Sequence, residues 1–147
     1  MLNNHIQQRI YFRRFIFLLT IILVNLNCKK QQEVVPNVSV NIYLSASDPN
    51  FINLNAVGGS AYITGGARGI IVYRKSSTEF MAYDRNCTYM PTNPCARVDI
   101  DKSTIMATDS CCGSKFLLTD GTVAKGPATI PLKSYRTDFD GNVLHIY

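Results

Sequence analysis

The chain has 147 residues, of which 46% are hydrophobic, and a length of this order fits a single domain. The formal net charge is +5, but from residue 28 onward twelve Lys and Arg residues face ten Asp and Glu residues, which leaves +2. No basic stripe remains in that part of the chain, so the charge pattern excludes nucleic acid as an expected partner.

A basic segment followed by an apolar run opens the chain. Arg9, Arg13 and Arg14 precede the twelve residues 15–26, FIFLLTIILVNL, which carry no charged side chain. This run is too short to span a bilayer comfortably as a helix, but its length suits the apolar region of a secretion signal. We therefore expect residues 1–27 to be a signal peptide. A buried N-terminal helix is the alternative.

A cysteine, Cys28, follows the apolar run directly and precedes two lysines. This arrangement resembles the processing site of bacterial lipoproteins, although residues 25–27 match the small-residue pattern only loosely. The resemblance implies that the thiol of Cys28 carries a lipid and anchors the exported protein to the envelope, with the outer membrane as the expected location and a periplasmic or surface-facing domain. An ordinary secretion signal is the alternative. Residues 28–37 are polar and contain one Pro, which predicts a short tether.

Short strand signals follow from residue 38 to the C-terminus. Apolar and polar residues alternate over 38–43, and Asp120-Gly121 and Asp140-Gly141 are hairpin turn signals. No segment shows a long apolar period of 3.6 residues, so residues 38–147 are predicted to form one all-β domain, a sandwich or small barrel. The further expected strands are 61–64, 69–74, 79–83, 96–100, 104–107, 116–119, 122–123, 136–139 and 142–147.

The cysteine count agrees with the lipid assignment. The sequence has five Cys, and removing Cys28 leaves the four residues Cys87, Cys95, Cys111 and Cys112. Cysteines of an exported protein meet an oxidising compartment, where thiols pair. Four cysteines allow three pairings, and their spacing alone does not select one.

Three sequence stretches between residues 87 and 132 carry a family resemblance: CTYMPTNPC, DSCCGSKF and DGTVAKGPATIPL. They are similar to the corresponding parts of Rieske domains. The resemblance implies a small antiparallel β-sandwich or barrel with two disulfide-linked loops. In Rieske domains these loops hold a [2Fe–2S] cluster through two Cys on one iron and two His on the other.

The four ligand positions of the family are largely altered in this chain. Cys87 matches the first cysteine ligand, whereas Tyr89 stands at the first histidine, Asp109 at the second cysteine and Cys112 at the second histidine. The sequence has two His, and the one that remains after removal of the leader, His145, is near the C-terminus. We therefore expect the cluster to be lost and no metal to be bound.

The frame around these positions is retained. The resemblance assigns Cys95 and Cys111 to the disulfide that locks the two loops together. It also implies that the Gly-Pro-Ala segment packs beneath the site. The other matching residues are Gly113, Ser114, Phe116, Gly126, Pro127, Ala128, Pro131 and Leu132.

Three uses of the remaining thiols are open. Cys87 and Cys112 are expected to form a second disulfide in place of the cluster. Alternatively, Cys87, Cys112 and Asp109 bind zinc, although structural zinc prefers four ligands. The third use is a redox-active bond between the adjacent Cys111 and Cys112, because strained disulfides are labile.

These features predict a membrane-anchored, non-catalytic lipoprotein with a structural or binding role in the cell envelope, acting on an envelope protein or ligand that the sequence does not identify. No catalytic residue and no cofactor are expected. The alternatives are a [2Fe–2S] electron-transfer protein with unusual ligands and a thiol–disulfide redox protein. Four basic residues are expected to be solvated surface charges: Arg68, Arg74, Lys75 and Arg85.

Overall fold

The computed structural model describes Arg9, Arg13, Arg14 and residues 34–45, 47–101 and 105–147. The predicted signal peptide, apart from those three arginines, and the predicted lipidation site Cys28 lie outside the described residues. Glu33–Tyr147 forms one compact unit, distinct from Met1–Gln32. No helix among the described residues has both the length and the apolar character needed to cross a membrane.

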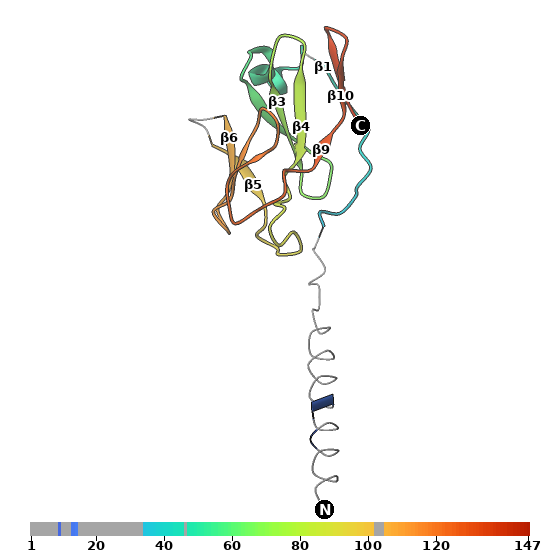
Figure 1. The fold of residues 1–147 in the computed structure, drawn as a ribbon. Coiled ribbons are helices and arrows are strands. Elements are labelled where there is room, and N and C mark those ends of the chain that lie inside the picture. The colour runs from blue at the N-terminus through green and yellow to red at the C-terminus, as the bar shows by residue number, and fades with distance from the viewer. Residues whose placement is uncertain (1–8, 10–12, 15–33, 46, 102–104) are drawn as a thin grey trace, which may run out of the picture. The chain divides into compact units, whose positions relative to one another are not determined.

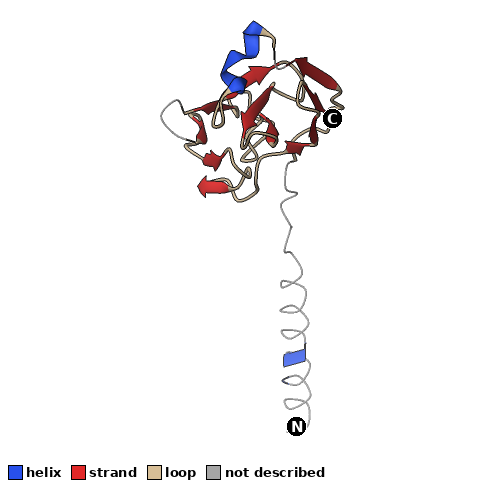
Figure 2. Cartoon of the chain, turned by 90° about the horizontal axis from the view of Figure 1, so that it is seen from above, coloured by secondary structure: helices blue, strands red, loops and turns tan. Residues whose placement is uncertain are grey.

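The compact unit is built from antiparallel strands, as the sequence predicts. They form three sheets, with the strand orders β1-β11-β10, β2-β3-β4-β9 and β5-β6-β7-β8. Figure 2 shows the 3-10 helix η1 in blue among the red strands. The described elements are β1 (Ile42–Ser45), η1 (Pro49–Asn55), β2 (Ser60–Ile63), β3 (Ile70–Arg74), β4 (Phe80–Asp84), β5 (Val98–Ile100), β6 (Met106–Asp109), β7 (Lys115–Leu117), β8 (Val123–Lys125), β9 (Ser134–Tyr135), β10 (Thr137–Phe139) and β11 (Val143–Ile146).

The sheet that contains β3 and β4 has a core on each of its faces. Successive side chains of a strand point to opposite faces, so Ile70 and Val72 belong to one core while Ile71 and Tyr73 belong to the other. The first core is shared with β1 and β11, and the second with β5, β6 and β7. Figure 1 accordingly shows β5 and β6 on one side of β3 and β4, and β1 and β10 on the other.

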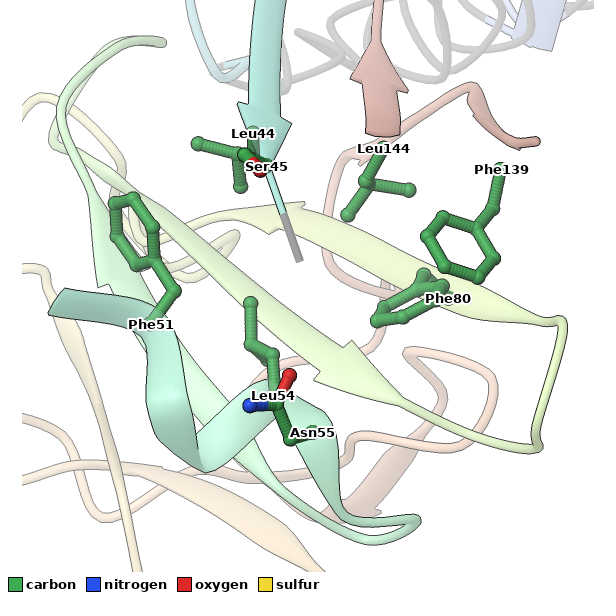
Figure 3. A pocket seen from close by; sticks show the side chains of 8 residues that line it. All are labelled: Leu44, Ser45, Phe51, Leu54, Asn55, Phe80, Phe139 and Leu144. Carbon is green, nitrogen blue, oxygen red and sulfur yellow. The ribbon is translucent and has the colours of Figure 1, made fainter. Parts of the chain in front are cut away.

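The core shared with β1 and β11 is aliphatic and aromatic. Its side chains come from five elements and converge on a small gap of about 20 Å³ (Figure 3). The lining residues are Leu44, Ser45, Phe51, Leu54, Asn55, Phe80, Phe139 and Leu144.

Both predicted Asp-Gly turns are present. Gly121 and Gly141 have φ of 76° and 98°, a backbone conformation that glycine adopts without steric cost. The side chain of Asp120 accepts hydrogen bonds from Thr122, and that of Asp140 accepts from the backbone N–H groups of Val143 and Asn142. These bonds hold the pKa of both carboxyl groups below its usual value.

Helix η1 is a feature that the sequence did not predict. Asp48 caps it by accepting a hydrogen bond of 2.9 Å from the N–H of Asn50, and Pro49 occupies the start of the helix. A segment of this length shows no apolar period, so the periodicity of the sequence gives no signal for it. The first strand is also shorter than predicted, since it begins at Ile42 and not at residue 38.

The prediction that the arginines are solvated surface charges is wrong. Arg74 donates from Nη1 to the carbonyls of Leu54 and Asn55, at 3.0 and 3.1 Å. Arg85 forms an ion pair with Asp99, and its guanidinium lies 4.0 Å from the ring centroid of Tyr62. Lys75, by contrast, forms only an exposed pair with Glu79.

The last residues of the predicted tether contact the compact unit. Val35 is buried, and Lys133 Nζ donates to the carbonyl of Pro36 and to the side chain of Asn37, at 2.9 and 3.1 Å. The packed domain therefore begins a few residues before the first strand.

Candidate functional site

Two loops meet at one end of the second core. The first loop, 85–97, joins β4 to β5, and the second loop, 110–114, joins β6 to β7. A disulfide between Cys95 and Cys111 connects them, with the two Cα atoms 5.8 Å apart. This confirms the predicted loop-locking pair.

The first loop is held by two side chains, one from the end of β4 and one from the segment between β2 and β3. Asp84, the last residue of β4, accepts a hydrogen bond of 2.8 Å from the N–H of Asn86. The guanidinium of Arg68 donates to the carbonyls of Pro94 and Asn93, the latter at 2.7 Å. These contacts fix the backbone on both sides of Cys87.

The second loop is a tight turn that starts at the end of β6. The N–H of Asp109 donates to the carbonyl of Ser114 at 2.9 Å, and Gly113, with φ of 78°, closes the turn. The hydroxyl of Ser114 is fully buried and accepts a hydrogen bond of 2.9 Å from the N–H of Ala128. The Gly-Pro-Ala segment therefore lies against this loop, as the resemblance implies.

Three of the four ligand positions, those of Cys87, Asp109 and Cys112, come together between the loops. The sulfur atoms of Cys87 and Cys112 are 3.8 Å apart. The sulfur of Cys112 lies 3.3 Å from Oδ2 of Asp109, and Cys87 also forms a hydrogen bond with the Asp109 side chain. The donor atoms of these three residues all lie within 4.8 Å of one another.

The expected second disulfide is absent, because Cys87 and Cys112 are free thiols in the structure. Their sulfur atoms are in van der Waals contact but are not bonded. The Cys111–Cys112 bond of the redox alternative is not present in the structure, since Cys111 is paired with Cys95.

The site is electrostatically unusual. Burial raises the pKa of the Cys87 thiol well above its ordinary value, and its hydrogen bond with Asp109 raises it further. Asp109 is fully buried, and within the described ranges no Lys, Arg or His forms an ion pair with it. Its Oδ1 accepts a hydrogen bond of 2.7 Å from the N–H of Cys111, which leaves Oδ2 facing the sulfur of Cys112.

A cavity of about 250 Å³ adjoins the Cys112 thiol and the Asp109 carboxylate. Tyr89, at the fourth ligand position, lines this cavity and has an exposed fraction of 38%. Met90 follows it with a φ of 51°, which is uncommon for a residue other than glycine. The cavity is lined by Tyr89, Met90, Asn93, Ala96, Asp109, Cys111, Cys112 and Pro127.

His145 is not part of this site. It lies on β11, in the sheet on the other side of β3 and β4, where its Nε2 is 2.7 Å from Asn41 Oδ1 and its ring stacks on Tyr43. The site residue that sequence reasoning missed is Arg68. Its partners are backbone carbonyls, and a sequence pattern gives no signal for such contacts.

Comparison with solved structures identifies the fold. The cyanobacterial plasma membrane Rieske protein PetC3 from Synechocystis PCC 6803 has 26% identity and a TM-score of 0.54, over 74% of this chain and 99% of that one. The ferredoxin of carbazole 1,9a-dioxygenase from Nocardioides aromaticivorans IC177 has 12% identity and a TM-score of 0.46, over 78% and 97%. A chain from the complex of reduced oxygenase and oxidized ferredoxin in carbazole 1,9a-dioxygenase has 22% identity and a TM-score of 0.47, over 72% of this chain and 99% of that one.

No protein-family model matches the sequence, and the search of curated proteins found no significant match. The structural similarity to the cyanobacterial protein, the antiparallel sheets and the disulfide that locks the two loops agree with one another. The compact unit therefore has a Rieske-like, all-β fold.

Proposed function

We propose that the protein is a lipid-anchored component of the bacterial envelope whose Rieske-like domain carries no [2Fe–2S] cluster and serves a structural or binding role. The observation that carries this proposal is the donor set between the two loops. It consists of two cysteines and one aspartate, with a tyrosine beside them and no histidine.

This donor set does not fit a Rieske cluster. One iron of such a cluster is held by two imidazoles, which give the centre its raised reduction potential. The corresponding positions here are Tyr89 and Cys112, and His145 belongs to the sheet on the other side of β3 and β4. The cysteine position on the other iron is Asp109, which offers a hard oxygen donor. Of the four positions, Cys87 alone keeps the family residue type.

Export and anchoring are supported by the leader. A basic segment, an apolar run and then Cys28 are the order found in lipoprotein precursors. The cyanobacterial protein similar to this chain is described as a plasma membrane Rieske protein, which agrees with a membrane-attached role for the domain.

The absence of the cluster is tested on the chain exported by a bacterial host and purified in detergent without air. Iron and acid-labile sulfide are measured per chain, together with visible absorbance and low-temperature EPR after reduction. We expect no labile sulfide and no reduced-state signal. Two irons and two sulfides per chain, with an EPR signal that Cys87→Ser removes, would overturn the proposal in favour of electron transfer.

Anchoring is tested by metabolic labelling with a radioactive fatty acid and by detergent partitioning. The wild-type chain should incorporate label and enter the detergent phase, whereas Cys28→Ala should do neither. Cys95→Ala is the matched control, since it removes a cysteine within the domain and should leave labelling unchanged. An unlabelled wild-type chain in the aqueous phase would contradict the anchoring proposal and leave the domain assignment intact.

A further inference from the structure

We infer that Cys87, Cys112 and Asp109 form a binding site for a single divalent ion of the zinc type, at the place where related domains hold two irons. The inference rests on the proposed absence of the [2Fe–2S] cluster, and three independent features of the site carry it. They are the size of the donor triad, the buried side chain of Asp109, which has no ion-pair partner among the described residues, and the cavity beside the triad.

The size of the triad matches one tetrahedral ion. With metal–sulfur bonds of about 2.3 Å, two thiolates on one tetrahedral ion are about 3.8 Å apart. The sulfur atoms of Cys87 and Cys112 are separated by 3.8 Å. A thiolate and a carboxylate oxygen on the same ion would be about 3.6 Å apart, and the corresponding distance from Cys112 Sγ to Asp109 Oδ2 is 3.3 Å.

The short distance between the sulfur atoms of Cys87 and Cys112 does not suit ligands of two different irons. By the family resemblance, Cys87 occupies a ligand position of one iron and Cys112 a position of the other. Ligands of different irons are kept apart by the bridging sulfides between them. Here the two sulfur atoms are in van der Waals contact at 3.8 Å, which leaves no room between them for sulfides that bridge two irons. One ion can occupy the remaining centre of the triad.

The charge of Asp109 supports a cation at this place. A buried carboxylate is stable when it is paired or coordinates a metal, because the loss of hydration is otherwise uncompensated. Asp109 is fully buried, and in the described part of the chain it has no ion-pair partner. Its Oδ1 is taken by the Cys111 N–H, while Oδ2 faces the thiols. A divalent cation would supply the missing positive charge.

The cavity leaves room for a fourth ligand. Zinc sites with three protein ligands keep a fourth position for water or another small molecule. Asp109 and Cys112 both line the cavity of about 250 Å³, so a water molecule or a small anionic or thiol ligand can reach an ion held by the triad. The phenol of Tyr89 lines the same space and is a candidate hydrogen-bond partner for that ligand.

The loops are also prepared for binding. The Cys95–Cys111 disulfide fixes the loops against each other, and the Ser114 hydroxyl lies 3.1 Å from the sulfur of Cys112. Ligands held by supporting contacts of this kind need little reorganisation when the ion binds. Because the two thiols release protons when they bind the ion, no electron acceptor is required.

The experiment uses the full chain in detergent, purified without air, with Zn²⁺ and Co²⁺ as probes. We expect native mass spectrometry to give one zinc per chain and no labile sulfide. Co²⁺ should bind at one per chain, with a near-ultraviolet thiolate-to-cobalt band and the visible bands of tetrahedral cobalt, and Zn²⁺ should displace it. Cys87→Ser and Cys112→Ser should each abolish the thiolate band.

Asp109→Asn tests whether the carboxylate of Asp109 is a ligand of the ion. It should weaken Co²⁺ binding by at least roughly tenfold, the effect that even a supporting residue of a metal site has. Asp138→Asn is the matched control, because it removes an exposed carboxylate of β10 and should leave the affinity unchanged. Circular dichroism and mapping of the Cys95–Cys111 bond verify that each variant is folded.

The possible failures are distinguishable. Absence of Co²⁺ and Zn²⁺ binding, or binding that the three site variants leave intact, would overturn the inference and leave the clusterless assignment standing. A wild-type chain with a Cys87–Cys112 disulfide and no bound metal would do the same. Iron with an equal amount of labile sulfide would instead overturn the proposed function.

Discussion

Asp84 and Asp109 are fully buried carboxylates that end β4 and β6, but their surroundings differ. Asp84 accepts hydrogen bonds from the N–H groups of Ala67, Arg68 and Asn86 and from the hydroxyl of Tyr135. Asp109 accepts one backbone N–H and otherwise faces two thiols. The hydrogen bonds of the fold satisfy the carboxylate of Asp84, whereas the carboxylate of Asp109 can still accept a further ligand. The comparison therefore separates a structural acid from one that is available to a ligand.

The glycine next to Asp84 shows how closely that region is packed. Gly66 has a φ of 62°, and a Cβ atom there would lie 2.5 Å from Asp84 Oδ2 and 2.6 Å from the Tyr135 hydroxyl. No comparable restriction is present at Gly113 beside Asp109, where an added Cβ would meet nothing within 4 Å. The Asp84 region is closed to additional atoms, and the second loop is open on its outer side.

The largest expected effect comes from removing the covalent link on the Asp109 side. Replacing Cys95 and Cys111 together by Ala should lower the free energy of unfolding by about 3 kcal/mol, because the link joins residues that are 16 positions apart in the unfolded chain. Denaturant unfolding measures the loss. Amide hydrogen exchange should rise in the two loops and stay slow around Asp84, and a uniform rise over the domain would contradict the proposed separation.

Asp84→Asn should cost about 1–3 kcal/mol, because the amide turns an N–H₂ group toward backbone donors that the carboxylate accepted. The measurement is the midpoint of denaturant unfolding at constant slope. A variant as stable as the wild type would show that the hydrogen bonds of Asp84 do not hold the first loop.

Tyr135→Phe removes a single donor from the same carboxylate, at 2.7 Å from Oδ2. The expected loss is about 1 kcal/mol, since the three backbone donors remain. Burial, followed by the Asp84 contact, raises the pKa of Tyr135, so its hydroxyl stays protonated and donating throughout the ordinary pH range. Spectrophotometric titration of tyrosine absorbance at alkaline pH should find one late-titrating group fewer in the variant.

Asp109→Asn should have the smallest effect on the metal-free protein, within about 1 kcal/mol of the wild type. The Cys111 N–H keeps an acceptor, and the loss of a buried charge without a cationic partner offsets the weaker contacts to the thiols. The same variant loses metal affinity under the inference above. A loss of stability as large as that of Asp84→Asn, in protein freed of metal with a chelator, would remove the distinction between the two carboxylates.

The sequence predicts where strands and turns lie more readily than it predicts which segments pair with one another. The hairpin turns at Gly121 and Gly141 follow from residue chemistry that acts over two or three positions. Cys95–Cys111 was predicted through the family resemblance and is confirmed. Helix η1 was not predicted, because a helix of one or two turns is too short to show an apolar period of 3.6 residues. Asp48 followed by Pro49 is nevertheless a helix start signal.

The residues of the site were predicted from the sequence, but the bonding between them was not. Cys87, Asp109 and Cys112 were assigned to ligand positions, and the structure brings their donor atoms together. The expected bond between Cys87 and Cys112 is not formed, since bonding requires a sulfur–sulfur approach that depends on the backbone of two loops. The lack of an ion-pair partner for Asp109 among the described residues also could not be predicted from the sequence. It depends on how far the fold places the Lys, Arg and His side chains from this carboxylate.

Arg68 gives the first loop a second attachment that does not depend on redox conditions. Its guanidinium reaches the carbonyls of Pro94 and Asn93 from the segment between β2 and β3. Because Arg68 holds the backbone next to Cys95, a reductant that cleaves the Cys95–Cys111 bond is expected to leave Cys95 close to Cys111. We therefore expect the covalent link to re-form from the folded state once an oxidant is supplied.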